Sequence, residues 1–156
     1  MQNNQSSGIA PSHAEVTAAL IIHEGKILIT QRPINKIFGG LWEFPGGKQQ
    51  PGESLADCLR RELLEELNII IEEGPLLFSV EHSYEHLGIT LHVFLCTRWQ
   101  GELQPREVQD WRWLAPADLN SYPLTPADQK VVQKIMSSEV SPALLKLLSR
   151  RHSYIS

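Results

Sequence analysis

Residues 46–69 read GGKQQPGESLADCLRRELLEELNI. A loop with three glycines and a proline precedes a segment that carries Glu62, Glu65 and Glu66 within five residues. Like charges at helical spacing destabilise a helix by a few tenths of a kcal/mol per pair, that is about 0.2–0.5 kcal/mol. A helix selected only for stability would not gather them, so we expect something else to offset the charge.

The second half of this stretch predicts an amphipathic helix from Ser54 to about Leu67. Ser54 can cap its N-terminus, and Asp57 follows three residues later, as in a capping box. At about 100° per residue the three glutamates share an arc of roughly 100°, which overlaps the edge of the apolar stripe. The stripe consists of leucines spaced four apart: Leu55, Leu59, Leu63 and Leu67.

Two interpretations of the acidic arc remain open. The first is a charged helix face with ion pairs at i, i+4, because Arg61 can reach Glu65. It leaves Glu62 and Glu66 without a Lys or Arg three or four positions away. The second is a metal site.

The loop before the helix favours the metal site. Gly46, Gly47 and Gly52 allow tight turns and close backbone approach, and Glu53 stands at the helix entrance, where the helix dipole favours negative charge. Carboxylates and backbone carbonyls are ligands that suit Mg²⁺ or Mn²⁺ rather than zinc. The loop and the helix together therefore predict a Mg²⁺ site, with Mn²⁺ as a substitute.

Bulk properties exclude several classes of protein. A chain of 156 residues suits one domain. Its net charge of −4 argues against stable nucleic-acid binding, which needs a basic surface, but not against a small anionic substrate. Cys58 and Cys96 are not paired in a C-x-x-C motif and are expected to be reduced structural thiols. We expect a cytoplasmic protein with no membrane segment, because no run of 18 apolar residues and no secretory signal are found.

The rest of the chain predicts strands around this helix. Residues 16–22 and 26–32 form a hairpin signal with Gly25 at the turn. A short strand at 41–44 is expected to stop at Pro45, and further strands are expected at 68–71, 76–80, 89–99 and 111–114. Thr125 and Pro126 predict the start of a helix that runs to 136, and residues 141–152 predict a last short helix. The fold class is therefore mixed α/β.

The spacing of the charged residues resembles the Nudix box, Gly-x5-Glu-x7-Arg-Glu-U-x-Glu-Glu-x-Gly-U, in which U is aliphatic. The box usually has Gly where this chain has Asn68, and Asn is the next-best residue for a left-handed helix end. Segments 41–48, 89–102 and 122–128 are similar to the MutT-type branch. The resemblance covers residues 15–136, which leaves a flexible N-terminal tail at 1–14 and a C-terminal helical extension at 137–156. The matching box residues are, in order, Gly47, Glu53, Arg61, Glu62, Leu63, Glu65, Glu66 and Ile69.

This resemblance implies an α/β/α sandwich around a mixed sheet, and an enzyme that hydrolyses nucleoside triphosphates to the monophosphate and pyrophosphate with Mg²⁺. Glu62, Glu65 and Glu66 look like the metal ligands, completed by the carbonyl of Gly46 or Gly47. Glu107 resembles an extra acidic ligand on a later loop, although it can also be an ordinary surface residue.

The resemblance also implies roles around these ligands. Arg61 would orient the carboxylates, and Glu53 would connect the loop to the helix through Arg61. Lys48 would contact a phosphate, or be simply solvated. Glu62, Glu65 and Glu107 are all candidates for the general base.

The resemblance places the base of the nucleotide near Arg32, Phe44 and residues 126–128. MutT-type enzymes that read oxidised guanine have Asn where this chain has Asp128, and some relatives that act on cytosine nucleotides have Asp. An ionised Asp accepts hydrogen bonds and would favour a base that presents an amine. Leu87 stands where MutT has an Arg near the base. Phe44 can also be plain core, and Asp128 a first-turn acid favoured by the helix dipole.

The leading hypothesis is thus a MutT-type triphosphate pyrophosphohydrolase, a monomer or homodimer that acts on a small nucleotide, either 8-oxo-dGTP or a cytosine nucleotide. One alternative is a Nudix hydrolase of a dinucleotide or nucleotide sugar, but the extra signatures of those enzymes are absent downstream of the box. Another is a Nudix-like binding module without catalysis, but such domains tend to lose box glutamates, and this chain keeps all four.

Overall fold

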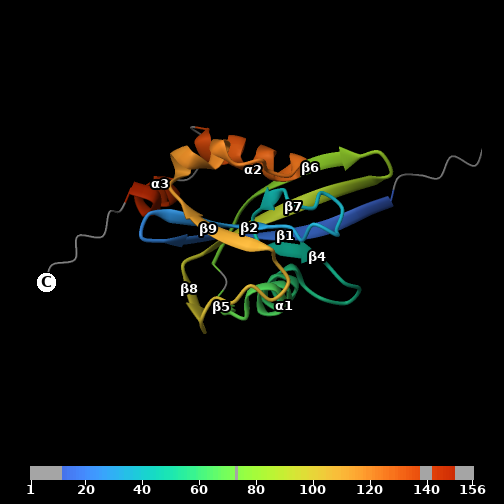
Figure 1. The fold of residues 1–156 in the computed structure, drawn as a ribbon, viewed down its shortest axis with the longest axis horizontal. Helices are drawn as coiled ribbons and strands as arrows, with labels where there is room; N and C mark the ends of the chain where they lie inside the picture. The colour runs from blue at the N-terminus through green and yellow to red at the C-terminus, as the bar shows by residue number, and fades with distance from the viewer. Residues whose placement is uncertain (1–11, 73, 138–141, 150–156) are drawn as a thin grey trace, which may run out of the picture.

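The protein is built as a mixed sheet between helices (Figure 1). The structure, a computed structural model, describes residues 12–72, 74–137 and 142–149. The main sheet contains β1 (Ser12–His23), β2 (Lys26–Gln31), β3 (Trp42–Glu43), β4 (Gly46–Lys48), β6 (Leu76–Tyr84), β7 (Leu87–Cys96) and β9 (Asp110–Leu114). A small second sheet pairs β5 (Ile70–Glu72) with β8 (Arg98–Gln100). The helices are α1 (Leu55–Leu67), the 3₁₀ helix η1 (Pro116–Ser121), α2 (Pro126–Met136) and α3 (Pro142–Ser149).

Strand β1 organises the main sheet. It runs parallel to β7 from Ser12 to Ile21, whereas its other pairings are antiparallel. Its second edge is shared by two strands: β4 pairs with residues 16–18 and β2 with residues 22–23. One long strand therefore holds both the hairpin and the glycine strand β4 that leads to α1.

Helices cover both faces of this sheet, which confirms the predicted α/β sandwich (Figure 1). On one face α1 packs Leu59, Leu63 and Leu67, all fully buried, against β1 and β7. Leu55 is only partly buried, and the Cys58 side chain is buried one turn further along. On the other face α2 packs against the sheet, and Leu144 of α3 joins the same cluster. In the described part of the chain, no helix combines the length and the apolar character that crossing a membrane requires.

Several strands differ from the predicted ones. β1 begins at Ser12, so residues 12–14, which were predicted to belong to the tail, are paired with β7. The predicted strand 89–99 breaks at Thr97 into β7 and β8, which belong to different sheets. Residues 46–48 form a strand where a turn was expected, because β1 offers their backbone a partner. Residues 1–11, 138–141 and 150–156, which include most of the predicted tail and the ends of the predicted extension, lie outside the described residues.

The ends of the helices are partly as predicted. The Ser54 hydroxyl accepts a hydrogen bond from the Asp57 N–H at 3.1 Å, as an N-cap should. The reciprocal half of a capping box is replaced by an ion pair, because the Asp57 carboxylate accepts from Arg60 at 2.6 Å. Thr125 occupies the N-cap position of α2, but its hydroxyl makes no capping hydrogen bond and donates to the Asp128 carboxylate instead.

Asn68 ends α1 in the left-handed conformation, with φ 61° and ψ 29°, and its N–H donates to the Leu64 carbonyl. This confirms the reason given for the departure from the glycine of the box. Asn is one of the few non-glycine residues that adopts this conformation at low cost.

We expect Asn68→Ala to lower the free energy of unfolding by about 1 kcal/mol, because Ala pays the left-handed penalty that Asn and Gly largely avoid. The matched variant Asn68→Gly should stay within about 0.5 kcal/mol of the wild type. Urea unfolding followed by circular dichroism measures both. Equal stability of the Ala and Gly variants would contradict this role of the cap.

Candidate active site

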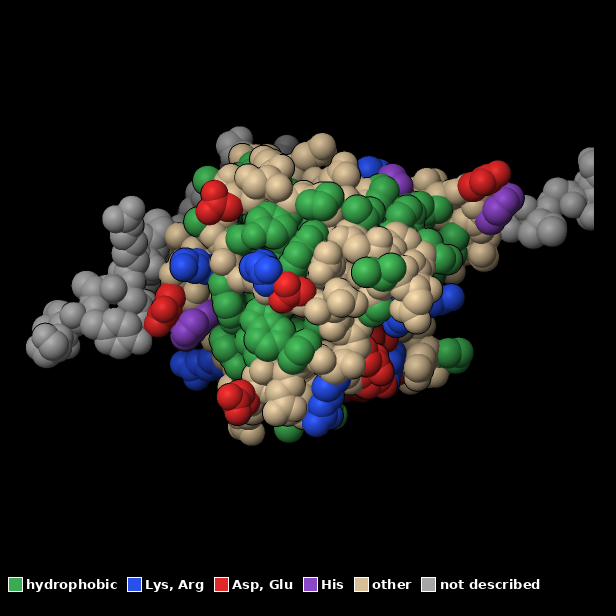
Figure 2. Space-filling view, in the orientation of Figure 1, with side chains coloured by type: hydrophobic (Ala, Val, Ile, Leu, Met, Phe, Trp, Pro, Cys, Tyr) green, Lys and Arg blue, Asp and Glu red, His purple; other side chains and the backbone are tan. Residues whose placement is uncertain are grey.

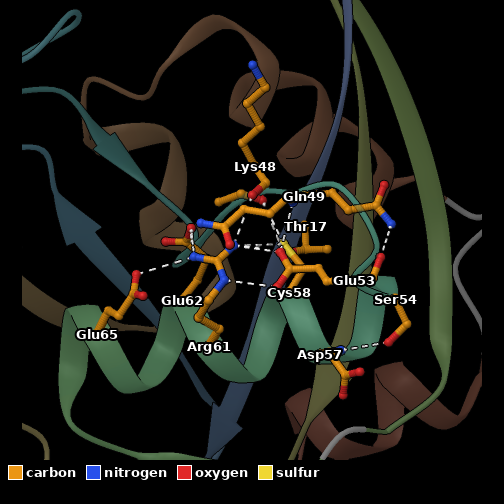
Figure 3. Close-up of polar contacts among 12 residues, drawn as sticks. Thr17, Lys48, Gln49, Glu53, Ser54, Asp57, Cys58, Arg61, Glu62 and Glu65 are labelled. Carbon is orange, nitrogen blue, oxygen red and sulfur yellow. Dashed lines mark hydrogen bonds and ion pairs between the residues drawn. The ribbon is translucent and has the colours of Figure 1, made fainter.

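The guanidinium of Arg61 connects the glycine loop to α1 (Figure 3). It donates to both Glu53 oxygens, from Nε at 2.9 Å and from Nη2 at 2.6 Å. Nη2 also donates to the Lys48 carbonyl at 3.1 Å, and the Gln50 N–H donates to Glu53 at 2.9 Å. These hydrogen bonds, led by the one from Arg61, lower the pKa of Glu53 to about 2. Glu53 therefore makes the predicted connection between loop and helix.

Arg61 also neutralises part of the acidic arc. Its Nη1 donates to Glu62 at 2.8 Å and to Glu65 at 3.3 Å. The Glu65 contact is the predicted i, i+4 pair, whereas Glu62 is paired with its direct neighbour in the sequence. Figure 2 shows acidic side chains gathered next to basic ones over the region of β4 and α1.

Glu66 is compensated differently. Burial raises its pKa well above the ordinary value, and the nearby charges of Glu43, Glu62 and Glu107 raise it further. The opposing influence is a hydrogen bond from the Gly46 N–H. Glu66 therefore lies where several carboxylates converge, and it is stabilised by a backbone dipole rather than by an arginine or lysine.

Glycine 47 allows Glu62 to approach the loop. A Cβ atom at this position would lie 2.3 Å from Cδ of Glu62, so any side chain here would collide with the carboxylate. A larger residue here would therefore push the Glu62 carboxylate away from the loop. This contact brings the loop backbone and the acidic arc together.

The two glycine carbonyls face different ways. In an antiparallel ladder, alternate residue pairs exchange N–H···O bonds. Because the Ala19 N–H donates to the Pro45 carbonyl at 2.7 Å, the pair formed by Thr17 and Gly47 is the next hydrogen-bonded one. The Gly46 peptide groups therefore point away from β1. This leaves Gly46 rather than Gly47 as the carbonyl that a cation can reach.

Glu107 lies on the loop after β8, beside the C-terminal half of α1. Its backbone N–H donates to the Glu66 carbonyl at 3.3 Å, and its exposed side chain is close enough to raise the pKa of Glu66. The structure thus brings Glu107 to the acidic arc from 41 positions further along the chain.

The donors gathered here fit a hard divalent cation by their chemistry. They are oxygens only, and the buried negative charge around Glu66 exceeds the positive charge placed against it. As the side chains stand, no three His, Cys, Asp or Glu groups within residues 12–72, 74–137 and 142–149 surround one point closely enough to hold a metal ion. Binding of a metal ion therefore requires the carboxylates to come closer together than they stand here.

A cavity of about 470 Å³ extends from the glycine loop across the sheet. All four residues predicted to bind the substrate line it: Arg32, Phe44, Lys48 and Asp128. Gly46 and Gly47 lie in its wall, and so does Leu87. A second hollow of about 740 Å³, lined by residues such as His23 and Trp99, includes none of the predicted site residues.

Both interpretations of Phe44 and of Asp128 are compatible with their places in the structure. Phe44 is both core and cavity wall, being 3% exposed, and its N–H donates to Asp128 Oδ1 at 3.0 Å. Asp128 lies in the first turn of α2 and also faces the cavity. The exposed Lys48 side chain points away from Arg61 (Figure 3).

Glu43 was missed at the level of sequence, although it lines the cavity and interacts electrostatically with both Asp128 and Glu66. Arg32 Nη1 donates to both Glu43 oxygens, at 3.1 and 3.0 Å, while Arg32 Nε donates to the Ile37 carbonyl. Burial and the nearby charge of Asp128 raise the pKa of Glu43 to about 7, and burial also raises the pKa of Asp128. An acid between Trp42 and Phe44 in a short strand was the available signal, since such a residue needs a specific partner.

Two aromatic residues at the cavity were missed as well. Phe38 and Tyr84 lie with ring centroids 5.4 Å apart, and both line the cavity. Phe38 has φ 58°, a left-handed conformation that bulky residues rarely adopt. Nothing in the composition of residues 33–41 separates Phe38 from an ordinary loop residue.

This arrangement agrees with comparisons with known proteins. Residues 17–134 match the family model of the NUDIX domain. The chain belongs to the Nudix family. Nudix enzymes act on small nucleotide substrates and generally need a divalent metal ion.

Individual Nudix proteins resemble the chain over most of its length. It is 41% identical to the CTP pyrophosphohydrolase of Escherichia coli strain K12, over 79% of this chain and 91% of that relative. It is 32% identical to the 8-oxo-dGTP diphosphatase of the same strain, over 78% of this chain and 95% of that relative. The solution structure of the E. coli ORF135 protein matches with a TM-score of 0.73 and 40% identity, over 80% of this chain and 89% of that one. The MutT NUDIX hydrolase from Burkholderia pseudomallei matches with a TM-score of 0.73 and 29% identity, over 80% and 98%.

The raised pKa of Glu43 predicts how stability changes with pH. Folding makes this acid bind its proton more tightly, so its contribution is fully present below about pH 4.5 and is lost as the pH rises through about 7. We expect Glu43→Gln, which carries no titrating group, to remove about 2 kcal/mol of the stability difference between pH 5 and pH 8. Thermal unfolding of the metal-free protein over this range measures the difference.

Glu85→Gln is the control, because Glu85 is 89% exposed at the tip between β6 and β7. This variant should keep the wild-type dependence on pH. If Glu43→Gln also keeps it, the shifted pKa of Glu43 is contradicted.

Proposed function

We propose that the protein is a divalent-metal-dependent pyrophosphohydrolase that cleaves nucleoside triphosphates to the monophosphate and pyrophosphate. One observation carries this proposal: a single cavity has the Nudix glycine loop in one wall and the buried acid Asp128 in another. A nucleotide lying in it would have its base near Asp128 and its phosphates near the acidic arc. The names of the relatives, CTP pyrophosphohydrolase and 8-oxo-dGTP diphosphatase, support the same reaction.

Mg²⁺, with Mn²⁺ as a substitute, is the cation that this donor set fits best. Glu62, Glu65, Glu66 and the Gly46 carbonyl would hold it, with Glu107 as a further ligand. When bound, it would supply counter-charge for the phosphates and Lewis acidity for the attack of water.

The residues of the chain provide positioning and charge. Arg61 and Glu53 hold the loop against α1, which keeps the Gly46 and Gly47 backbone next to the carboxylates. The cavity wall contains two cations, Arg32 and Lys48. Arg32 is paired with Glu43, so Lys48 is the one proposed to approach a phosphate. Glu62, Glu65 and Glu107 remain the candidates for the general base, since each places a carboxylate near the loop or at the edge of the arc.

Asp128 would favour a base with an exocyclic amine, which cytosine shares with adenine and guanine. Both Asp128 oxygens accept hydrogen bonds from within the protein, from the Phe44 N–H and the Thr125 hydroxyl, yet a carboxylate keeps further lone pairs for a substrate donor. Leu87 adds an apolar wall where a guanine-reading relative would have a charged group. We therefore propose cytosine nucleotides as the preferred substrates, with 8-oxo-dGTP as the alternative.

The test is a panel of CTP, dCTP, the other common nucleoside triphosphates and 8-oxo-dGTP with Mg²⁺, in which pyrophosphate and phosphate are measured separately. We expect pyrophosphate release, fastest with a cytosine nucleotide. Faster turnover of 8-oxo-dGTP would reject the cytosine preference alone. If no triphosphate is hydrolysed, the proposed reaction is rejected, and a dinucleotide and nucleotide-sugar panel then separates another hydrolase from a binding module.

Glu66→Gln tests the metal ligands. It is nearly isosteric and can still accept from the Gly46 N–H, but it removes the charge that a cation needs. We expect kcat to fall by at least ~100-fold, a loss of about 2.7 kcal/mol of transition-state stabilisation. The melting temperature without metal should not fall, because the substitution removes a buried charge that has no counter-ion in the metal-free protein. The increase that Mg²⁺ gives to the wild type should disappear.

The control is Asp57→Asn on the exposed first turn of the same helix, which should retain both activity and the Mg²⁺ effect. A Glu66→Gln enzyme that keeps more than about a tenth of the wild-type kcat would reject metal ligation by Glu66.

A further inference from the structure

A buried cluster of three polar atoms lies directly behind the glycine loop (Figure 3). The Thr17 hydroxyl donates to the Gly47 carbonyl at 3.3 Å, and the Cys58 thiol donates to the same carbonyl at 3.4 Å. Thr17 Oγ1 and Cys58 Sγ are themselves 3.4 Å apart. Three elements, β1, β4 and α1, therefore meet at one carbonyl.

Both side chains of this cluster are shielded from water. Thr17 is 1% exposed and Cys58 is fully buried, so neither side chain can exchange its partner for bulk water. A hydroxyl removed from water costs about 1–3 kcal/mol unless it is hydrogen-bonded. The Gly47 carbonyl, which the ladder already pairs with the Thr17 backbone N–H, is the acceptor that both side chains reach. The two side chains therefore add to the constraint that the ladder places on it.

The neighbouring atoms of the loop belong to the candidate metal site. The Gly46 N–H donates to Glu66, and the Gly46 carbonyl points away from β1. The Glu62 carboxylate packs against Gly47 Cα. A small rotation of the Gly47 peptide would therefore move a candidate carbonyl ligand and alter the contacts of two candidate carboxylate ligands.

The close packing of the loop against β1 leaves little room for such a rotation. A Cβ atom at Gly46 would lie 2.0 Å from the Thr17 carbonyl oxygen, and Gly46 has φ 153°. Backbone contact of this kind sets how close β4 lies to β1. The side chains of Thr17 and Cys58 add a constraint on the direction of the Gly47 carbonyl.

We propose that Thr17 and Cys58 are positioning residues, which hold the Gly47 carbonyl and thereby aim the Gly46 carbonyl and N–H at the cation and at Glu66. This role rests on the proposed metal-dependent function. It differs from that of a structural thiol, which the sequence alone predicted for Cys58, because it requires the S–H donor and not only the volume of the side chain.

The experiment compares variants that remove the donor with variants that retain one. Thr17→Val and Cys58→Ala remove it, while Thr17→Ser and Cys58→Ser keep a hydroxyl. Cys96→Ala is the matched control, because Cys96 is equally buried, belongs to β7 and lies in the apolar cluster beneath α1 rather than beside the glycine loop. Mn²⁺ binding to each metal-free protein is measured by calorimetry, together with the melting temperature and the Mg²⁺ concentration that gives half-maximal hydrolysis.

We expect Thr17→Val and Cys58→Ala to weaken Mn²⁺ binding by ~10-fold and to raise the required Mg²⁺ concentration similarly, which is the lower end of the loss seen when groups that orient metal ligands are removed. KM for the nucleotide at saturating metal should stay unchanged. Thr17→Ser and Cys58→Ser should recover most of the metal affinity. Cys96→Ala should lower the melting temperature without changing Mn²⁺ binding.

The positioning role is overturned if Thr17→Val and Cys58→Ala bind Mn²⁺ as tightly as the wild type, or if their serine counterparts recover nothing. Should Thr17→Val fail to fold, the two Cys58 variants decide between these outcomes. A wild-type protein that neither binds Mn²⁺ nor hydrolyses nucleotides would reject the proposed function itself, and the positioning role with it. A wild type that does both leaves the two proposals to be judged separately.

Discussion

The guanidinium of Arg61 is the charge on which the local structure depends. It is shared by Glu53, Glu62, Glu65 and the Lys48 carbonyl, so the glycine loop cannot separate from the helix without depriving Glu53 and the Lys48 carbonyl of this partner. A lysine would not serve as well, because only the planar guanidinium presents a fork of donors to one carboxylate and further donors to others. Without Arg61, the negative charges of the acidic arc would repel Glu53 at the end of the glycine loop.

The acids fall into two groups by how they are compensated. Glu53 and Glu62 accept hydrogen bonds from Arg61, and Glu65 does so more weakly from the exposed edge. Glu66 has a backbone N–H instead and lies near three further carboxylates, whose repulsion raises its pKa. Burying charge in this way costs stability unless a counter-ion is supplied. The fold therefore tolerates uncompensated negative charge at Glu66, and a divalent cation would neutralise this charge.

The sequence was most informative where one residue type satisfies one local requirement. The extent of α1, its buried leucines, the Ser54 cap and the left-handed Asn68 could all be predicted, because each depends on neighbours within a few positions. The strand β4 could not, since a Gly-Gly-Lys segment carries no strand signal and forms only because β1 approaches closely enough to pair with it.

The residues of the candidate site also divide into those that the sequence reveals and those that depend on distant segments. Box residues were found through their spacing, and the structure places them together. Glu43, Phe38 and Tyr84 escaped notice because their importance comes from contacts between segments far apart in the chain. Thr17 was predicted only as part of a strand and Cys58 as a structural thiol, since a hydroxyl and a thiol reveal nothing in sequence about a carbonyl that folds against them.

Residues 43–48 set the separation between the two ends of the cavity, which are Asp128 and the carboxylates of the acidic arc. Along this short segment the Glu43 carboxylate influences both Asp128 and Glu66, the Phe44 N–H binds Asp128, and the Gly46 N–H binds Glu66. The segment contacts α2 through Asp128 and α1 through Glu66, helices that cover opposite faces of the sheet (Figure 1). The distance between the group that would read the base and the carboxylates that would hold the cation is therefore set by a few peptide units. A nucleotide whose base fits Asp128 would thus carry its phosphates to the acidic arc at a fixed separation, so that recognition and chemistry depend on the same piece of backbone.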